Sequence, residues 1–191
     1  MRPRPRSLRS LTVAALVPLA ASLLGSSPVR GQEAEETPGV RPSDTGAFVI
    51  ERSVTLPGTR EEIWQVVTGD ISGWWDHHVS DDPHRFYIEP KPGGCFCEIF
   101  DESGDGVAHA RVTFARRPTT LRFVGPLGLM GNALHMVTTY RLESRGDSTR
   151  LQVEIHGSGE VREGWPEAVD AAWKHFLEER LGPYVEGDPG E

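Results

Sequence analysis

A run of short β-type segments does most to constrain how this 191-residue chain can fold. Between residues 86 and 156, segments rich in β-branched and aromatic residues are separated by the turn-forming sequences KPGG, ESGDG, RRP and SRGD. Loops this short join neighbouring strands as antiparallel hairpins, because a parallel return needs a longer crossover. The run therefore predicts an antiparallel meander. Its strands are expected at residues 86–88, 95–100, 107–114, 119–124, 134–142 and 149–156.

A strand and two short helical segments are expected before the meander. Residues 47–56, AFVIERSVTL, alternate roughly between apolar and polar and predict a first strand. The sequence then takes a helical period, and Thr59 with Glu62 three residues later forms the pattern of a capping box. A second short helical turn is expected in DISGWWDHH, which carries Trp74 and Trp75.

One long amphipathic helix is expected to cover the sheet. Residues 165–185 place Val169, Trp173 and Phe176 along one apolar stripe, and the Gly-Pro pair that ends at Pro183 is expected to stop or kink the helix. In the later strands of the meander one face is apolar and the other is charged, so one face meets a core and the other meets water. The sequence therefore predicts an α+β domain in which the C-terminal helix lies across a curved antiparallel sheet.

The N-terminus carries the pattern of a secretory signal peptide. Four arginines within residues 2–9 precede the apolar run 11–24, and small residues and PVRGQ follow it. An apolar run of about 14 residues is shorter than the roughly 20 residues that span a bilayer as a helix. We therefore expect a signal peptide at residues 1–31, export to the periplasm or the medium, and no stable membrane span after processing. The alternative is a disordered basic tail.

Cleavage after Gly31 defines the rest of the chain. Residues 32–46 contain acids, prolines and glycines without an apolar period and are expected to be a flexible leader, which leaves residues 47–187 as one domain with a real core. Cleavage also removes five arginines and no acid, so 15 basic and 28 acidic residues remain, with a net charge of −13. Such a surface repels nucleic acid phosphates and anionic lipids, and no nucleic acid partner is expected.

The order of the elements and four short motifs resemble a known family. The motifs are ISGWW, IEPKPGGCFCE, GPLGLMG and TRLQVEI. With them, residues 48–185 resemble the START-like (SRPBCC) superfamily, in the branch named after the activator of Hsp90 ATPase. The resemblance implies a helix-grip fold and a START-like ligand-binding domain, whose mostly apolar cavity between sheet and C-terminal helix holds lipids, hydrophobic metabolites or polyketide-like molecules. The export signal departs from the intracellular members and argues against a role with Hsp90.

Large apolar residues on the expected inner faces predict the cavity wall, because such faces bury each other. These residues are Trp75, Phe100, Phe123, Met136, Tyr140, Trp173 and Phe176. Three function classes fit such a domain. The first is a non-catalytic protein that binds a small hydrophobic ligand. The second is a cyclase- or dehydratase-like enzyme in the same cavity, and the third is a protein–protein interaction module.

Glu98 is the best single candidate for a catalytic acid or base. It shares a strand face with two phenylalanines, and a carboxylate among aromatic rings has its pKa raised by desolvation. A surface glutamate, or one with a structural partner, is the simpler interpretation. The DHH sequence at residues 76–78, next to two tryptophans, is a candidate for the pocket mouth, but His77, His78 and His84 are interpreted first as solvated loop imidazoles. No cofactor is expected, since GPLGLMG lacks the lysine and the helix of a phosphate-binding loop.

Cys95 and Cys97 are the two cysteines of the chain and stand one residue apart. In a regular strand they lie on one face, with Cβ atoms farther apart than the roughly 3.5–4.5 Å of a disulfide, so a bridge needs a bulge or turn there. We favour two small, buried structural side chains. A functional thiol or metal pair and a disulfide are the alternatives. The histidines show no spacing that would complete a zinc site with the two cysteine sulfurs. His109 is on the next strand, but a shift of one residue in the hairpin register would move it to the opposite face. No metal is therefore expected.

Overall fold

The computed structural model describes residues 40–42 and 46–187. The predicted signal peptide, residues 1–31, lies outside the described residues. The strands are β1 (Val40–Pro42), β2 (Phe48–Pro57), β3 (Gly69–Asp70), β4 (Arg85–Ile88), β5 (Cys95–Ile99), β6 (Gly106–Arg116), β7 (Thr120–Val124), β8 (Leu134–Arg145) and β9 (Ser148–Gly159). The helical segments are α1 (Arg60–Val66), the 3-10 helix η1 (Leu127–Leu129), α2 (Trp165–Lys174), the π-helix η2 (His175–Leu181) and α3 (Gly182–Glu186).

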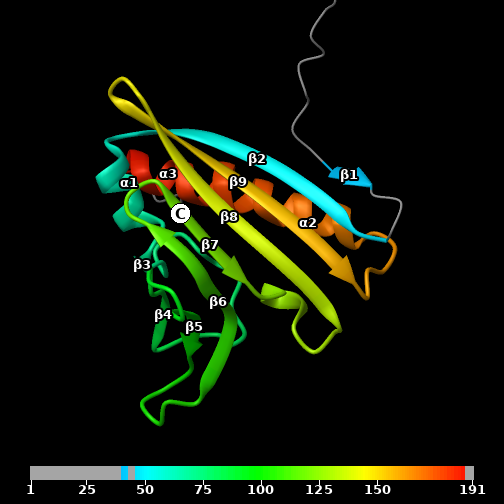
Figure 1. Cartoon of the computed structure of the whole chain (residues 1–191). Coiled ribbons are helices and arrows are strands. Elements are labelled where there is room, and N and C mark those ends of the chain that lie inside the picture. Colours follow the sequence, from blue (N-terminus) through cyan, green and yellow to red (C-terminus); the bar gives the residue numbers. More distant parts are fainter. Residues whose placement is uncertain (1–39, 43–45, 188–191) are drawn as a thin grey trace, which may run out of the picture. The chain divides into compact units, whose positions relative to one another are not determined.

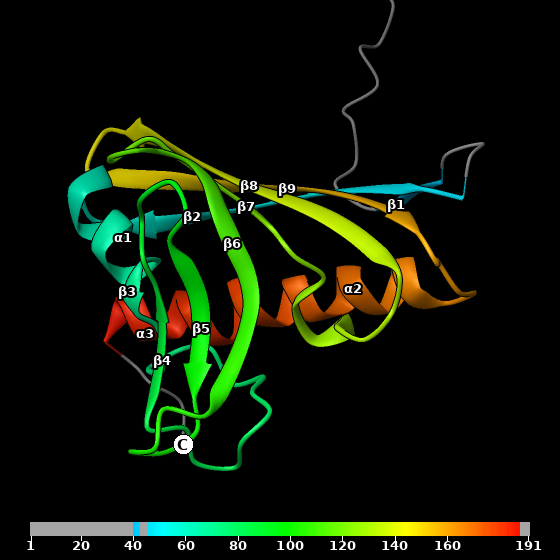
Figure 2. The same ribbon diagram turned by 60° about the horizontal axis from the view of Figure 1, so that its bottom comes forward.

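The described strands form one antiparallel sheet in the order β1-β2-β9-β8-β7-β6-β5-β4-β3. Strands β4 to β9 are the predicted meander, and each lies within a few residues of its expected position. Strand β2 pairs with β9 along its whole length, which brings the first predicted strand beside the last. Figures 1 and 2 show the sheet curving around the C-terminal helix. The predicted α+β architecture is confirmed.

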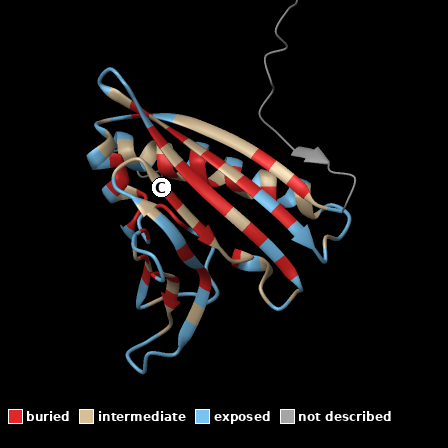
Figure 3. Ribbon diagram, viewed as in Figure 1, coloured by how far each residue is buried: buried red, intermediate tan, exposed pale blue. Residues whose placement is uncertain are grey.

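Alternate residues of the long strands point into the core, as the apolar and polar pattern predicted. In β9, Leu151, Val153 and Ile155 are buried while the residues between them are partly exposed. In β8, Met136 and Tyr140 point the same way. Figure 3 shows this alternation as bands of buried and exposed residues along the strands. The buried face is the one that the C-terminal helix covers.

Three shorter segments can be compared with their predictions. The capping box is present, since Thr59 Oγ1 accepts a hydrogen bond from Glu62 N and Glu62 Oε2 accepts one from Thr59 N. The second helical turn is a single one, in which Ile71 O accepts hydrogen bonds from the amides of the two following tryptophans. Within the predicted flexible leader, Val40–Pro42 forms strand β1, which pairs with β2. Backbone hydrogen bonds form this pair, and they need no alternation of apolar residues in the sequence.

The C-terminal helix continues past its expected end. Segments α2, η2 and α3 follow one another without a break, and the helix ends at Gly187, whose φ of 80° is the left-handed conformation common after helix ends. Inside the π-helix the hydrogen bonds widen, and Gly182 N donates to Leu177 O, five residues back. Pro183 thus follows a widened turn. Of the two outcomes expected at Gly182 and Pro183, a stop or a kink, the stop does not occur, and the helix type changes there instead.

A β-bulge between β5 and β6 decides where His109 points. Phe96 pairs with Ala110. The next residue, Cys97, pairs with Ala108, so His109 is an extra residue on β6. As a result His109 and Ala110 are both buried although they are adjacent. The bulge therefore settles the register that the sequence left open and puts His109 on the inner face.

Cys95 and Cys97 form a disulfide. The favoured prediction of two small, buried structural side chains is therefore wrong, and the disulfide alternative is the one that the structure has. Their Cα atoms are 5.3 Å apart, which is less than the roughly 6.7 Å that two residues span in a regular strand. The shorter distance occurs where the pairing of β5 with β6 is irregular. In a regular strand the two cysteines would be too far apart for a disulfide, and this limit does not apply at the bulge. Phe96 and Glu98 are buried, so the cysteines that alternate with them face the outer side of the sheet, away from His109.

Candidate functional site

An open pocket of about 660 Å³ lies beside the C-terminal helix. Its walls come from the loop after Ile71, from β6, from the segment around η1, from β8 and from the helix itself. The lining residues are Trp75, Asp76, His77, His78, Val79, Asp81, His109, Pro126, Leu127, Gly128, Leu129, Met136, Trp165, Ala168, Val169, Ala172, Trp173 and Phe176. One side is therefore apolar and one rim carries acids and histidines.

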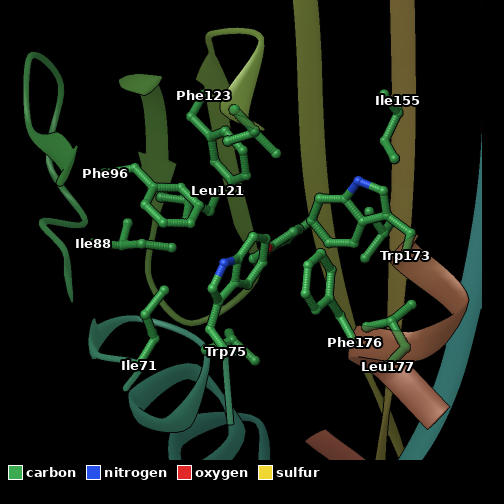
Figure 4. Close-up of a cluster of buried hydrophobic side chains, with 14 of the residues drawn as sticks. Ile71, Trp75, Ile88, Phe96, Leu121, Phe123, Ile155, Trp173, Phe176 and Leu177 are labelled. Atoms are coloured by element: carbon green, nitrogen blue, oxygen red, sulfur yellow. The ribbon is translucent and has the colours of Figure 1, made fainter. Parts of the chain in front are cut away.

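Trp75 is the centre of the aromatic cluster behind this pocket. Its ring stacks on Phe176 with 4.0 Å between ring centroids. It meets Trp173 and Phe96 edge-on, at 5.6 and 5.1 Å. Figure 4 shows Trp75 between the strands and the helix, with the other rings directed towards it. Trp75 Nε1 also donates to His77 O at 2.8 Å, so the same residue packs the core and holds the loop at the pocket rim.

The predicted wall residues divide into three groups. Those that line the pocket are Trp75, Met136, Trp173 and Phe176. Phe123 and Tyr140 are fully buried behind Trp173, with 5.3 Å between their ring centroids and 5.9 Å from Tyr140 to Trp173. Phe100 is half-buried just beyond the end of β5 and does not line the pocket.

Some pocket residues were not predicted from the sequence. Leu127 and Leu129 come from the GPLGLMG segment, and Trp165 and Ala168 come from the first turn of α2. Leu127 has a φ of 52°, which is uncommon for a residue with a β-carbon, and its side chain is buried. The glycines and leucines of GPLGLMG are the sequence feature from which this part of the pocket wall could have been predicted.

Glu98 is fully buried and holds the pocket loop in place. Its carboxylate accepts hydrogen bonds from Val79 N at 2.8 Å, from Ser80 N at 2.6 Å and from His109 Nε2 at 2.9 Å. Burial by itself raises the pKa of Glu98, but the hydrogen bonds from Ser80, Val79 and His109 outweigh it and hold the pKa below the usual value for glutamate. The expected raised pKa is therefore corrected: Glu98 is an anionic structural partner of the loop and of His109.

Asp76, His77 and His175 meet at the rim of the pocket. Asp76 Oδ1 lies 3.0 Å from His77 Nδ1, and Asp76 Oδ2 lies 2.8 Å from His175 Nε2. The hydrogen bond to Glu179 and then the one to Asp76 raise the pKa of His175. Burial alone raises the pKa of Asp76, but the two histidines outweigh it and lower that pKa. The sequence placed residues 76–78 at a candidate pocket mouth, but the contact of Asp76 with His175 was not predicted, because these two residues lie 99 positions apart.

Two of the other histidines have the exposed loop positions that the sequence predicted. His78 and His84 are exposed, as expected for loop imidazoles, although His78 also lines the pocket. His135 is exposed on β8, whereas its neighbour Met136 is buried in the pocket wall. The candidate site therefore consists of an apolar wall, the buried pair of Glu98 and His109, and the cluster at the rim.

Several solved structures share this architecture. Protein MLL2253 of Mesorhizobium loti is 18% identical to this chain and superposes with a TM-score of 0.56. The match covers 73% of this chain and 97% of MLL2253. The Aha1 dimer of Colwellia psychrerythraea has a TM-score of 0.52 and 20% identity, covering 74% and 98%. Protein CV1439 of Chromobacterium violaceum has a TM-score of 0.52 and 18% identity, covering 72% and 96%. No family model and no curated protein matches the chain.

The chain has the START-like, helix-grip fold. The predicted resemblance is thereby confirmed at the level of the fold, which is what identities near 20% show. Among residues 40–42 and 46–187, the START-like domain contains no helix with the length and apolar character needed to cross a bilayer. What the domain does must be argued from its pocket.

Proposed function

We propose that this START-like domain binds a small, mainly hydrophobic molecule in the pocket beside the C-terminal helix. One observation carries the proposal: the pocket is open, yet Trp75, Trp173, Phe176, Leu127 and Met136 present apolar surface to it. A volume of about 660 Å³ lies within the roughly 300–1,000 Å³ usual for small-molecule sites. An apolar surface of this kind gains free energy when a ligand displaces its water.

The polar rim adds a constraint on the ligand. Asp76, His77, His78 and Asp81 lie on one side of the pocket. A few polar groups in a mainly apolar pocket fix the orientation of a ligand and provide specificity. The preferred ligand therefore has an apolar body and one polar end, which favours lipids and polyketide-like metabolites over uniformly apolar molecules.

A pocket-filling variant tests the proposal. The neutral fluorescent probe N-phenyl-1-naphthylamine should bind the wild type, and fatty acids or fused aromatic acids should displace it. Ala168→Phe places a ring in the pocket and should weaken probe binding by at least about tenfold. Ala171→Phe is the matched control, since Ala171 is an exposed residue of the same helix outside the pocket. Equal binding by both variants would place the probe elsewhere and refute the proposal.

We also propose that the protein acts outside the cytoplasm. The observation behind this is the arginine-rich start, apolar run and small-residue boundary of residues 1–31. In cell fractions, the protein should occur in the periplasm or medium with Gln32 at or near its N-terminus. Exported protein that begins at Met1, or protein confined to the cytoplasm, would contradict this.

A second candidate function is proton transfer by His109. Its ring lines the pocket, and Glu98 accepts a hydrogen bond from its Nε2. A proton held on Nε2 leaves the lone pair of the neutral ring on Nδ1, which is how an acidic partner prepares a histidine to act as a base. Glu98 is then a positioning residue rather than the catalytic group. A ligand captured from the host should change mass on incubation with wild type but not with His109→Asn.

An interaction module is the least supported of the three classes. The large apolar side chains exposed on the described surface are Val79, Phe114 and Tyr184. They belong to a loop, to β6 and to α3, and therefore come from separate elements. Single exposed apolar residues are normal for soluble proteins and do not mark an interface.

A further inference from the structure

The rim cluster has the composition and spacing of a metal site. Asp76, His77 and His175 each offer one ligand atom, and these atoms lie within 4.8 Å of one another. Ligand atoms bound to zinc at about 2.0–2.1 Å in a tetrahedral site lie roughly 3.3 Å apart. Asp76 Oδ1 lies 3.0 Å from His77 Nδ1 and 3.1 Å from His175 Nε2, and both distances are close to that spacing. Small side-chain movements are enough to admit an ion.

A fourth residue orients the histidine on the helix. Glu179 Oε2 lies 3.0 Å from His175 Nδ1, one turn along the π-helix. Nε2, the atom that faces Asp76, gives up its proton when it binds a metal ion, and the carboxylate of Glu179 then keeps the other proton on Nδ1. Metal-binding histidines usually have such a carboxylate on the other ring nitrogen. The cluster is therefore more than three adjacent polar groups, because one of its histidines already has the carboxylate partner on its other ring nitrogen that metal-binding histidines use.

We propose that Asp76, His77 and His175 bind a divalent transition-metal ion, with Zn²⁺ as the best match, at the rim of the pocket. Two imidazoles and one carboxylate are a typical set for zinc sites that keep a fourth position open, whereas Mg²⁺ and Ca²⁺ prefer oxygen ligands. Asp76 and His77 line the pocket, and the His77 ring packs edge-on against Phe176 with 4.7 Å between centroids.

The open coordination position faces the bound molecule. On this point the inference rests on the proposed ligand function: the polar end of an amphipathic ligand, such as a carboxylate or an enolate, completes the coordination while its body fills the apolar side. The site then selects molecules by chemistry as well as by shape. Metal binding itself does not depend on that ligand and is tested separately.

Arg180 competes with the ion. Its Nε lies 3.2 Å from Asp76 Oδ2, so in the absence of metal the guanidinium neutralises part of the charge of Asp76. The side chain is 35% exposed and can turn to solvent when an ion takes its place. Because the guanidinium and the ion compete for Asp76, a variant of Arg180 without its charge should bind the metal ion more tightly.

Calorimetry with untagged, chelator-treated protein tests the metal site. Zn²⁺ should bind at one site per chain, and Co²⁺ should give the visible absorption of a tetrahedral complex with nitrogen and oxygen ligands. His77→Ala should weaken Zn²⁺ binding by at least about tenfold, and Glu179→Gln should weaken it roughly 10–100-fold. Both residues are well exposed, with side chains 59% and 63% accessible, so neither change threatens the fold. Arg180→Gln should tighten binding.

His156→Ala is the matched control. His156 is an exposed histidine that pairs with Glu154 on β9, outside the pocket, and its loss should leave zinc binding unchanged. No binding, or binding that His77→Ala and Arg180→Gln do not change, would show an adventitious ion only and overturn the inference. Probe binding to the metal-free protein is measured in parallel, so that failure of the metal site is distinguished from failure of the pocket.

Discussion

His109 Nε2 lies 2.9 Å from Glu98 Oε2, and the two side chains are only 5% and 0% exposed. The pair joins β5 to β6 at the bulge, and through the amides of Val79 and Ser80 it also joins the sheet to the pocket loop. A buried carboxylate is stable only when hydrogen bonds and charge replace its lost water. Removing its charge should therefore affect the fold and the pocket together.

Glu98→Gln should lower the free energy of unfolding by roughly 2–4 kcal/mol at pH 7, because three hydrogen bonds to a charged, buried acceptor are weakened or lost. The pKa of Glu98 in the folded protein is held below its usual value of 4.5. At pH values above 4.5 the ionised carboxylate therefore stabilises the folded state relative to the unfolded state. This contribution should disappear as the pH falls from about 4.5 through the folded pKa. Urea unfolding of both proteins between pH 3 and pH 7 measures it.

Glu102→Gln is the control for that experiment, since Glu102 is an exposed carboxylate in the loop between β5 and β6. It should change stability little at any pH. A stability difference between wild type and Glu98→Gln that stays constant down to pH 3 would contradict the assigned role, because it would not depend on the ionised carboxylate.

The fold was predictable because its signals are local. Turn sequences such as SRGD mark the hairpin between β8 and β9, where Gly146 has a φ of 72°, and the alternation around Val153 reports which face is buried. The capping box of α1 is likewise written in residues three positions apart. Each of these features needs only neighbouring residues, and together they leave few possible topologies.

The site was only partly predictable because it depends on long-range geometry. Inward-facing aromatic residues of the strands look alike in the sequence, yet Met136 lines the pocket while Tyr140 lies behind Trp173. The position of His109 depends on one extra residue in β6. The contact between Asp76 and His175 joins segments 99 residues apart, and no spacing in the sequence signals it.

Tyr140→Phe should leave the protein as stable or make it more stable by about 1 kcal/mol. The Tyr140 hydroxyl is buried, and it has no hydrogen-bond partner among the described residues. Burial raises the pKa of Tyr140, so the hydroxyl stays protonated and its desolvation is not compensated. Thermal and urea unfolding measure the change. A loss of more than 1 kcal/mol would mean that the hydroxyl does have a partner, such as a buried water.

Reduction of the disulfide between Cys95 and Cys97 should cost little stability. The bridge closes a loop of three residues, for which chain entropy gives roughly 1.6 kcal/mol. The cysteines face the outer side of β5, so the pocket should be unaffected. The double variant Cys95→Ala, Cys97→Ala should bind the naphthylamine probe with wild-type affinity. Thiol titration of denatured, unreduced protein should find no free thiol, and two free thiols would refute the bridge.

Trp173 connects the stability of the fold to the shape of the pocket. Its side chain is 1% exposed, yet it lines the pocket, and its ring meets Trp75, Tyr140 and Phe176 within 5.9 Å between centroids. Trp173→Ala should lower the free energy of unfolding by roughly 3–5 kcal/mol, because the large cavity cannot collapse between helix and sheet.

Trp173→Phe should keep the fold and change ligand binding, since a smaller ring preserves most of the packing while it deepens the pocket at its inner wall. Near-UV circular dichroism checks the fold, and probe titration checks affinity. The other tryptophans contribute to intrinsic fluorescence, so the difference between the two proteins is the informative signal. Wild-type affinity and an unchanged spectral response in Trp173→Phe would mean that the ligand does not reach this part of the helix, and the binding site would then have to lie nearer Leu127 and Trp165.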